Sequence, residues 1–174
     1  MPDRLSPGST RTAPSTMHWG GGEKWATDAQ QGKLRTRDNI IIGTWNVRTL
    51  NGTGKLEELT YEMSKYRWNI LGLCEVRWKQ FGETSTADGH KIYYSGREDK
   101  HEHGVGFLVH KDNVNHVMSC NPISSRLITI RLRASPFNIT IIQAYAPTSD
   151  YEDKDIESFY DHRILWKKHQ KKIF

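Results

Sequence analysis

The stretch NIIIGTWN, residues 39–46, decides the fold class of this 174-residue chain. Ile40, Ile41 and Ile42 are three β-branched residues in succession, which is typical of a strand that is buried on both faces. Asn46 closes the stretch at the carboxyl end of that strand. The hydrophobic core is therefore expected to begin here, with a polar side chain at the end of its first strand.

A helix and a second strand are predicted to follow. The apolar residues that recur at helical spacing are Leu56, Leu59 and Met63. They predict a helix that has Thr53 as its N-cap and runs to about Tyr66. Residues 70–74, ILGLC, predict another buried strand, and Glu75 follows it directly. Strand, helix and strand in this order favour an α/β architecture, in which functional residues lie just beyond the carboxyl ends of the strands.

The sequence after Glu75 is rich in predicted strands, which lie at residues 92–95, 105–110, 127–132 and 138–145. In the third of these, Ile128 and Ile130 alternate with Thr129 and Arg131. This period of two indicates a strand with one face toward a core and the other toward solvent.

A group of polar residues between two predicted strands invites comparison with a metal site. The trio His101-Glu102-His103 is followed by His110 and His116. Their spacing does not place them on one face of a helix, where two histidines could bind the same zinc ion. The polar residues around the trio favour a hairpin loop over zinc ligation.

The two ends of the chain differ from its middle. Residues 1–38 are rich in Pro, Ser, Thr and Gly and have no sustained period, which predicts a disordered N-terminal segment. The net charge of +5 comes from residues 163–174, because five basic residues there have no acid among them and leave 20 basic and 20 acidic residues before position 163. The pI of 9.2 therefore does not indicate a DNA-binding surface on the body of the protein. We expect one domain at residues 39–160 and a basic tail at residues 161–174.

Cysteine usage and hydropathy bear on the compartment. Cys74 and Cys120 have no metal-ligand spacing, and Cys74 lies in an apolar run where a reduced thiol is usual. The first thirty residues lack the apolar segment of a secretory signal, and no apolar stretch approaches the ~18 residues of a membrane span. We expect an intracellular protein of the nucleus or cytoplasm that is not secreted and does not bind membranes.

Four motifs, in this order along the chain, carry a family resemblance: TWNVR at 44–48, LGLCE at 71–75, GVGFL at 104–108 and QAYAP at 143–147. Together they resemble the endonuclease/exonuclease/phosphatase family. They are especially similar to the endonucleases of RTE-type non-LTR retrotransposons and to the cellular sequences called craniofacial development protein 2-like. The resemblance covers about residues 39–159 and implies an α/β fold, the N-terminal half of a four-layer α/β sandwich of the DNase I type.

The resemblance implies roles for three residues. Glu75 would be the ligand of a Mg²⁺ cofactor, since a carboxylate at a strand end suits this oxygen-preferring cation. Asn46 would orient the catalytic groups through its amide, and Tyr145 would place its phenol against the phosphate that is cleaved. Without the resemblance, Asn46 would be interpreted as a turn cap, Glu75 as a surface acid at a strand end and Tyr145 as a core or rim aromatic.

DNA is the partner that the resemblance implies. Arg77, Trp78, Arg131 and Arg133 would line a groove for it through phosphate contacts and stacking, although arginines on the outer face of a strand are often merely solvated. Arg48 is a departure, because the branch that repairs abasic sites commonly has an acid near this position. This difference argues against abasic-site repair.

Two later motifs of the family, Gly-Asp-Phe/Trp-Asn and Ser-Asp-His, are absent from the sequence, and Asp161-His162 only imitates the second. Half a sandwich would leave the inner face of one sheet unpaired, and the chain could associate through that exposed apolar face. We therefore expect a truncated retrotransposon-type endonuclease that has little or no activity alone. The alternatives are a non-catalytic module that binds nucleic acid or protein, and a phosphatase of the same superfamily.

Overall fold

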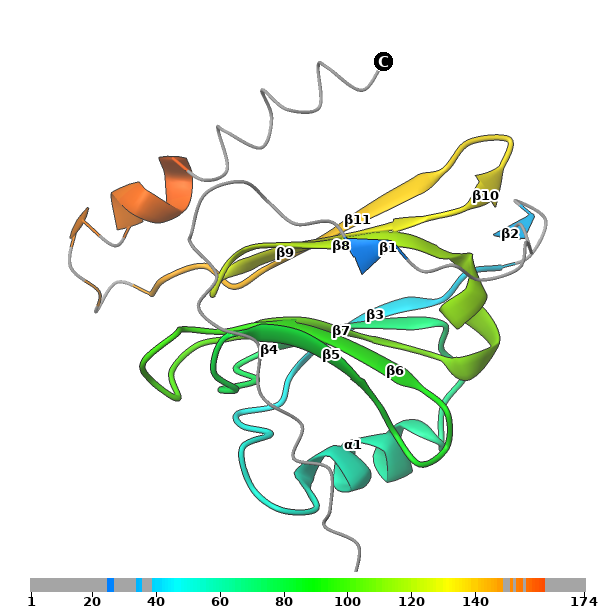
Figure 1. Cartoon of the computed structure of the whole chain (residues 1–174), viewed down its shortest axis with the longest axis horizontal. Coiled ribbons are helices and arrows are strands. Elements are labelled where there is room, and N and C mark those ends of the chain that lie inside the picture. Colours follow the sequence, from blue (N-terminus) through cyan, green and yellow to red (C-terminus); the bar gives the residue numbers. More distant parts are fainter. Residues whose placement is uncertain are drawn as a thin grey trace, which may run out of the picture.

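The computed structural model describes residues 25–26, 34–35, 39–148, 151, 153–154 and 156–161, which form a mixed α/β fold with two main sheets and few helices (Figure 1). In chain order the elements are β1 (Trp25–Ala26), β2 (Leu34–Arg35), β3 (Ile42–Asn46), α1 (Lys55–Met63), β4 (Ile70–Cys74), β5 (Phe81–Ser85), β6 (Lys91–Ser95), β7 (Val105–Val109), the 3₁₀ helix η1 (Lys111–His116), β8 (Val117–Ser124), β9 (Leu127–Leu132), β10 (Ala134–Ser135) and β11 (Ile139–Ala144). Residues 153–154 and 156–161 are also helical.

The strands form two larger sheets and one small pair. The five-stranded sheet has the order β3-β4-β7-β6-β5, and the four-stranded sheet has the order β1-β8-β9-β11, while β10 pairs with β2. All pairs in the larger sheets are antiparallel except β3 and β4, which are parallel. Because Asn46 is the partner of Cys74 in that parallel pair, the two strands end side by side.

The two larger sheets pack face to face around the main core (Figure 1). The five-stranded sheet contributes the buried residues Ile70, Tyr93, Val105, Phe107 and Val109, and the four-stranded sheet contributes Val117, Cys120, Ile128, Ile130 and Leu132. The expectation of an unpaired inner face is therefore wrong, since the strands from β8 onward supply a second apolar layer. Association of the chain with a partner stays a prediction.

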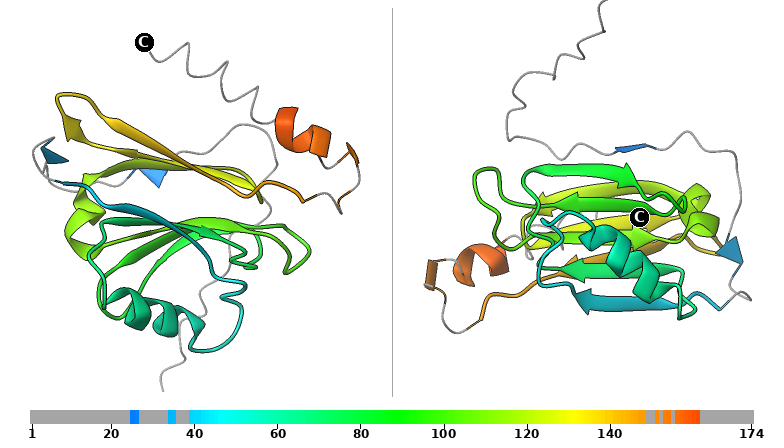
Figure 2. Two further views of the ribbon diagram at one scale, coloured as in Figure 1. Left: turned by 180° about the vertical axis from the view of Figure 1, so that it is seen from behind. Right: turned by 90° about the horizontal axis from the view of Figure 1, so that it is seen from below.

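Helix α1 lies across the outer face of the five-stranded sheet (Figure 2). Leu59 and Met63 of the helix belong to a second core cluster with Leu71 and Leu73 of β4, so the predicted helical spacing is confirmed. The predicted ends are wrong: the N-cap is not Thr53, and the helix stops at Met63, short of Tyr66. The N-cap is Gly54, whose backbone is left-handed with φ of 80°, a conformation that glycine adopts without steric cost.

The first predicted strand is not buried on both faces. Strand β3 begins at Ile42 and lies at the edge of its sheet, where it pairs only with β4. Ile41, Ile42 and Trp45 are 43%, 47% and 41% exposed. An edge strand has a neighbour on one side only, and the β-branched pattern does not distinguish an edge position from a central one.

The later strand predictions are confirmed to within one residue by β4, β6, β7, β9 and β11. Strands β5 and β8 were not predicted, because polar residues such as Glu83 and Asn121 interrupt their apolar pattern. The trio that includes His101 lies in the loop between β6 and β7, as predicted. The predicted disordered segment, residues 1–38, and the predicted basic tail, residues 161–174, lie outside the described residues apart from β1, β2 and Asp161. Among the described helices, none has the length and apolar character to cross a membrane.

Candidate active site

Glu75 lies at the centre of a polar cluster at the carboxyl end of β4. Its backbone has φ of 58° and its side chain is 17% exposed. Asn46, at the end of the neighbouring parallel strand β3, donates from Nδ2 to Glu75 Oε1 at 2.7 Å. The backbone N–H of Arg48 donates to Asn46 Oδ1 at 3.0 Å and so fixes which face of the amide points at the carboxylate. The parallel pairing of β3 and β4 therefore positions both side chains.

Tyr145 reaches the same carboxylate from the other sheet. It directly follows β11, and its hydroxyl donates to Glu75 Oε1 at 3.2 Å. Its backbone N–H donates to the carbonyl oxygen of Arg126 at 2.9 Å, which extends the β9–β11 pairing to the edge of the cluster. The structure thus brings together the three residues that the resemblance singles out, Asn46, Glu75 and Tyr145, from three strands and both sheets. Their roles in chemistry stay predictions.

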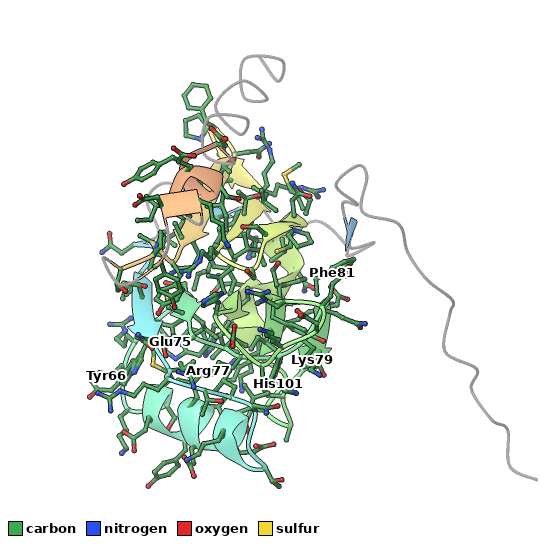
Figure 3. All side chains as sticks on the ribbon, turned by 90° about the vertical axis from the view of Figure 1, so that its left-hand side faces the viewer. Tyr66, Glu75, Arg77, Lys79, Phe81 and His101 are labelled. Carbon is green, nitrogen blue, oxygen red and sulfur yellow. The ribbon has the colours of Figure 1, made fainter. Side chains whose placement is uncertain are left out.

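Arg77 binds the second oxygen of the carboxylate. Its NH2 group lies 3.0 Å from Glu75 Oε2, and its side chain is 45% exposed. His101 Nδ1 donates to the carbonyl oxygen of Arg77 at 2.8 Å, so the β6–β7 loop supports the turn that carries this arginine. Glu75, Arg77 and His101 lie on the same face of the molecule (Figure 3). Both oxygens of Glu75 therefore have hydrogen-bond donors.

Several residues in and near this cluster have a strained, left-handed backbone. The non-glycine residues with positive φ are Arg48, Glu75, Arg77, Gln80 and His103 among the described residues. The left-handed conformation costs an L-residue about 1–2 kcal/mol. Such conformations persist where the surrounding structure enforces them, and they are common at functional sites.

The donors around Glu75 favour its ionised form. The hydrogen bond from Asn46 is the largest cause that lowers the pKa of Glu75 below its ordinary value of 4.5. Burial, the second-largest cause, opposes it, and the hydrogen bonds from Arg77 and Tyr145 lower the pKa further. The pKa of Tyr145 is raised by burial first and by the charge of Glu75 second. At neutral pH the cluster therefore contains a carboxylate and a protonated phenol.

The lowered pKa of Glu75 predicts a pH-dependent contribution to stability. A depressed carboxyl pKa stabilises the folded state above the pKa of the unfolded chain, and the contribution is lost as the pH falls through the folded value. We expect the free energy of unfolding of the chain, relative to that of Glu75→Gln, to be constant above about pH 5.5 and to decline below it. Urea unfolding of both proteins from pH 7 to pH 3 measures this difference, and a difference that does not change with pH would contradict the assignment.

Gln143 joins the two sheets beneath the cluster, a role that sequence reasoning missed. Its side chain is buried, and Nε2 lies 2.9 Å from Cys74 Sγ and 3.4 Å from Thr44 Oγ1. Gly72 leaves the space that this side chain fills, because a Cβ on Gly72 would overlap the carboxamide. The glutamine inside the fourth motif and the glycine inside the second were the available signals.

Arg126 and His103 form a second polar group beside Tyr145. Arg126 NH1 donates to the carbonyl oxygen of Tyr145 at 3.2 Å, and NH2 donates to His103 Nε2 at 3.0 Å. The guanidinium also lies over the rings of Tyr145 and Tyr151, at 5.2 and 4.5 Å from their centroids. Sequence reasoning placed His103 in a loop without a role and did not single out Arg126, which lies in the turn just before β9 and in no recognisable pattern.

The other predicted nucleic-acid contacts do not join the Glu75 cluster: Arg131 and Arg133 lie away from it, and Trp78 is bonded to another loop. Arg131 pairs across the sheet with Thr140, five residues before Tyr145 on β11, which corresponds to roughly 17 Å along the strand. Arg133 lies one residue beyond the end of β9, farther still from the cluster. Trp78 donates from Nε1 to the carbonyl oxygen of Leu50 at 2.8 Å and packs in the second core cluster. Of the four residues, only Arg77 joins the cluster, and DNA binding by all four stays a prediction.

The oxygen donors of the cluster fit a weakly held Mg²⁺ ion. Within the described part of the chain, no group of three His, Cys, Asp or Glu side chains is placed to hold a metal. Glu75 supplies a hard oxygen ligand, whereas Asn46 presents its Nδ2 group to Glu75 and its Oδ1 to the N–H of Arg48. Mg²⁺ in proteins is often bound by one or two carboxylates together with waters and substrate phosphates. The residues present are compatible with Mg²⁺ that the substrate helps to hold.

Comparison with known proteins identifies homologues of this chain. No family model matches it. It is 38% identical to craniofacial development protein 2 from Bos taurus over 157 residues, or 86% of this chain, and 36% identical to the protein of that name from Tragulus javanicus over 154 residues, or 88%. The matched part is 26% of each relative, so the chain spans about a quarter of the length of these proteins. The predicted resemblance to craniofacial development protein 2-like sequences is confirmed.

Proposed function

Proceeding from this homology with craniofacial development protein 2, we propose that the chain supplies part of the active site of a Mg²⁺-dependent, phosphodiester-cleaving endonuclease of the retrotransposon type. The observation that carries the proposal is the convergence of Asn46 and Tyr145 on the Glu75 carboxylate from three strand ends. The four ordered sequence motifs support the same reading. Because the described part of the cluster contains a single carboxylate, we expect little or no cleavage by this chain alone.

Each residue of the cluster has a distinct task in this proposal. Glu75 would hold Mg²⁺, and a bound Mg²⁺ would supply positive charge that neutralises the phosphate. Asn46 keeps the carboxylate ionised and oriented, because its amide is itself fixed by the backbone N–H of Arg48. Tyr145 keeps its proton at neutral pH and can donate a hydrogen bond to a phosphate oxygen.

Arg77 competes with a metal ion for Glu75. Its guanidinium lies against Oε2, so a cation that binds this oxygen must displace it. The Arg77 side chain is 45% exposed and can move into solvent. An exposed ion pair such as that between Arg77 and Glu75 contributes about 0.2–1 kcal/mol, which is the free energy lost when a metal displaces Arg77. The competition is therefore expected to weaken metal binding by a small factor rather than to prevent it.

The proposed metal site can be tested by titration with Tb³⁺, with the ring of Tyr145 as the group that sensitises Tb³⁺ luminescence. Tb³⁺ binds oxygen ligands, and its luminescence is sensitised by an aromatic ring nearby, so a signal that Mg²⁺ displaces reports metal at Glu75. We expect Glu75→Gln to weaken Tb³⁺ and Mg²⁺ binding by about tenfold or more. Arg77→Gln should strengthen binding about two- to fivefold, because it removes the competing cation. Glu57→Gln, an exposed change on α1, is the matched control.

Two outcomes would count against the proposal. One is a metal affinity that neither Glu75→Gln nor Arg77→Gln changes, which would place bound metal elsewhere. The other concerns activity, for which the same proteins are incubated with supercoiled plasmid and Mg²⁺: nicking that persists in Glu75→Gln would separate activity from this cluster. Nicking that Glu75→Gln abolishes would confirm the site and overturn the expectation of inactivity.

A non-catalytic nucleic-acid-binding module is the second candidate. The observation that favours it is the ion pair itself, since Arg77 neutralises the one carboxylate of the cluster and leaves a site suited to phosphate contacts. Stable DNA binding without cleavage in the presence of Mg²⁺ would support this candidate. Hydrolysis of small phosphomonoesters in preference to DNA would instead support a phosphatase.

A further inference from the structure

We propose that a pocket beside the Glu75 cluster binds a second phosphate of a nucleic-acid strand, with Arg126 as its anchor. The inference rests on the proposed function, because it assigns a neighbouring subsite to the same substrate. The pocket has a volume of about 500 Å³ and lies between the β6–β7 loop, the β8–β9 turn and the helical residues 156–161. Its lining includes Arg126, His103 and the serines Ser124, Ser125 and Ser158.

Arg126 pairs with no acid among the described residues. The residue is only 8% exposed, and the partners described for it are the carbonyl oxygen of Tyr145, the imidazole of His103 and two aromatic rings. No carboxylate among the described residues forms an ion pair with it. A buried charge is costly unless an opposite charge accompanies it, so the pocket favours an anion at this guanidinium.

The other charges of the pocket do not supply that anion. Asp99 lies on the rim and pairs with Arg97, whose Nε is 3.5 Å from its Oδ1, and Arg97 also lies 3.8 Å from Glu102. Glu98, the other acid of the lining, is exposed to solvent. Among the described residues, the acids of the rim therefore lie near Arg97 or in solvent, and none pairs with the guanidinium of Arg126.

The NH2 group of Arg126, which donates to His103, is the group that an anion can bind in place of the imidazole. A guanidinium only donates hydrogen bonds, so the contact of 3.0 Å makes His103 Nε2 the acceptor for NH2. The hydroxyl of Tyr151 lies 3.1 Å from the same nitrogen. A phosphate oxygen is a stronger acceptor than a neutral imidazole, and the planar fork of arginine matches phosphate.

Tyr145 connects the pocket with the Glu75 cluster. Its phenol donates to Glu75, and its carbonyl oxygen accepts from Arg126, so the two sites flank a single residue. A substrate that occupies both must carry at least two phosphates. This arrangement favours a polynucleotide strand over a small phosphomonoester as the ligand.

Binding of a fluorescently labelled, single-stranded oligodeoxynucleotide tests the pocket, with fluorescence anisotropy as the readout and EDTA present so that metal does not contribute. We expect Arg126→Gln to weaken binding about tenfold or more, because it removes a charge-assisted contact. The slope of log affinity against log salt concentration should also decrease by the equivalent of about one phosphate contact. Arg97→Gln, on the rim of the same pocket but paired with acids, is the matched control and should change the affinity less than twofold.

A second measurement and a further variant make every outcome decisive. The Tb³⁺ titration of Glu75→Gln reports the proposed metal site separately from the oligonucleotide measurement in EDTA, so loss of metal binding and loss of the pocket are distinguishable. Arg126→Lys keeps the charge without the fork and tests the site if Arg126→Gln does not fold. Undiminished binding by a folded Arg126→Gln, or by Arg126→Lys where the glutamine variant is unfolded, would overturn the proposal.

Discussion

Replacement of Phe107 with alanine should lower the free energy of unfolding by about 3–5 kcal/mol. Phe107 lies on β7, is fully buried and belongs to the core between the two sheets. Truncation of a buried phenylalanine removes its apolar contacts and leaves a cavity that the neighbouring side chains fill only in part. Urea unfolding followed by circular dichroism measures the change.

Phe137→Ala is the matched control for this experiment. Phe137 is 81% exposed in the loop before β11, and its truncation should change stability by less than about 0.5 kcal/mol. Equal effects of the two substitutions would mean that the sheets do not pack in solution as the structure shows. The comparison therefore tests the finding that this chain pairs the inner faces of both sheets.

Gly96→Ala should destabilise the protein by about 2–3 kcal/mol and disturb the Glu75 cluster. A Cβ on Gly96 would overlap the backbone carbonyl of Trp78, which is part of the chain and cannot rotate away as a side-chain end can. The N–H of Gly96 also donates to the carbonyl oxygen of Gln80 at 2.6 Å. The alanine methyl must therefore push apart the segment that follows Arg77.

The control for Gly96→Ala is Gly54→Ala at the start of α1. Gly54 has open space around its Cα but a positive φ, so alanine there costs about 1 kcal/mol of backbone strain without a steric overlap. Thermal unfolding gives both stabilities, and the Tb³⁺ signal reports the cluster. We expect only Gly96→Ala to weaken the metal signal, and a loss no larger than that of Gly54→Ala would contradict the packing of Gly96 against Trp78.

The edge strands β3 and β11 of the two sheets have exposed apolar side chains. Ile42 and Trp45 on β3 and Ile142 on β11 are 40–47% exposed. The contact between Gln143 and Thr44 shows that these edges lie on the same side of the molecule. An association of the chain would therefore involve these edges, rather than the sheet face that the sequence led us to expect.

The strand prediction succeeded where burial is continuous. Residues 70–74 form β4 as predicted, because a short uninterrupted apolar run of this length is typical of a buried strand. It failed at β8, where Pro122 and Asn121 lie within a strand whose register shifts twice. Irregular pairing needs no apolar period, so the sequence contains no signal for it.

The sequence by itself determined which residues end the strands: Asn46, Glu75 and Tyr145 each follow an apolar run, and local pattern is enough to place them. Only the tertiary structure decided that these ends meet, since the hydrogen bonds to Glu75 join strands separated by 29 and 70 positions in the chain. The same holds for Arg126 and His103, whose proximity arises from the packing of one sheet on the other. A local pattern encodes burial and period, whereas long-range contacts depend on how the sheets stack, and no short stretch of sequence specifies that.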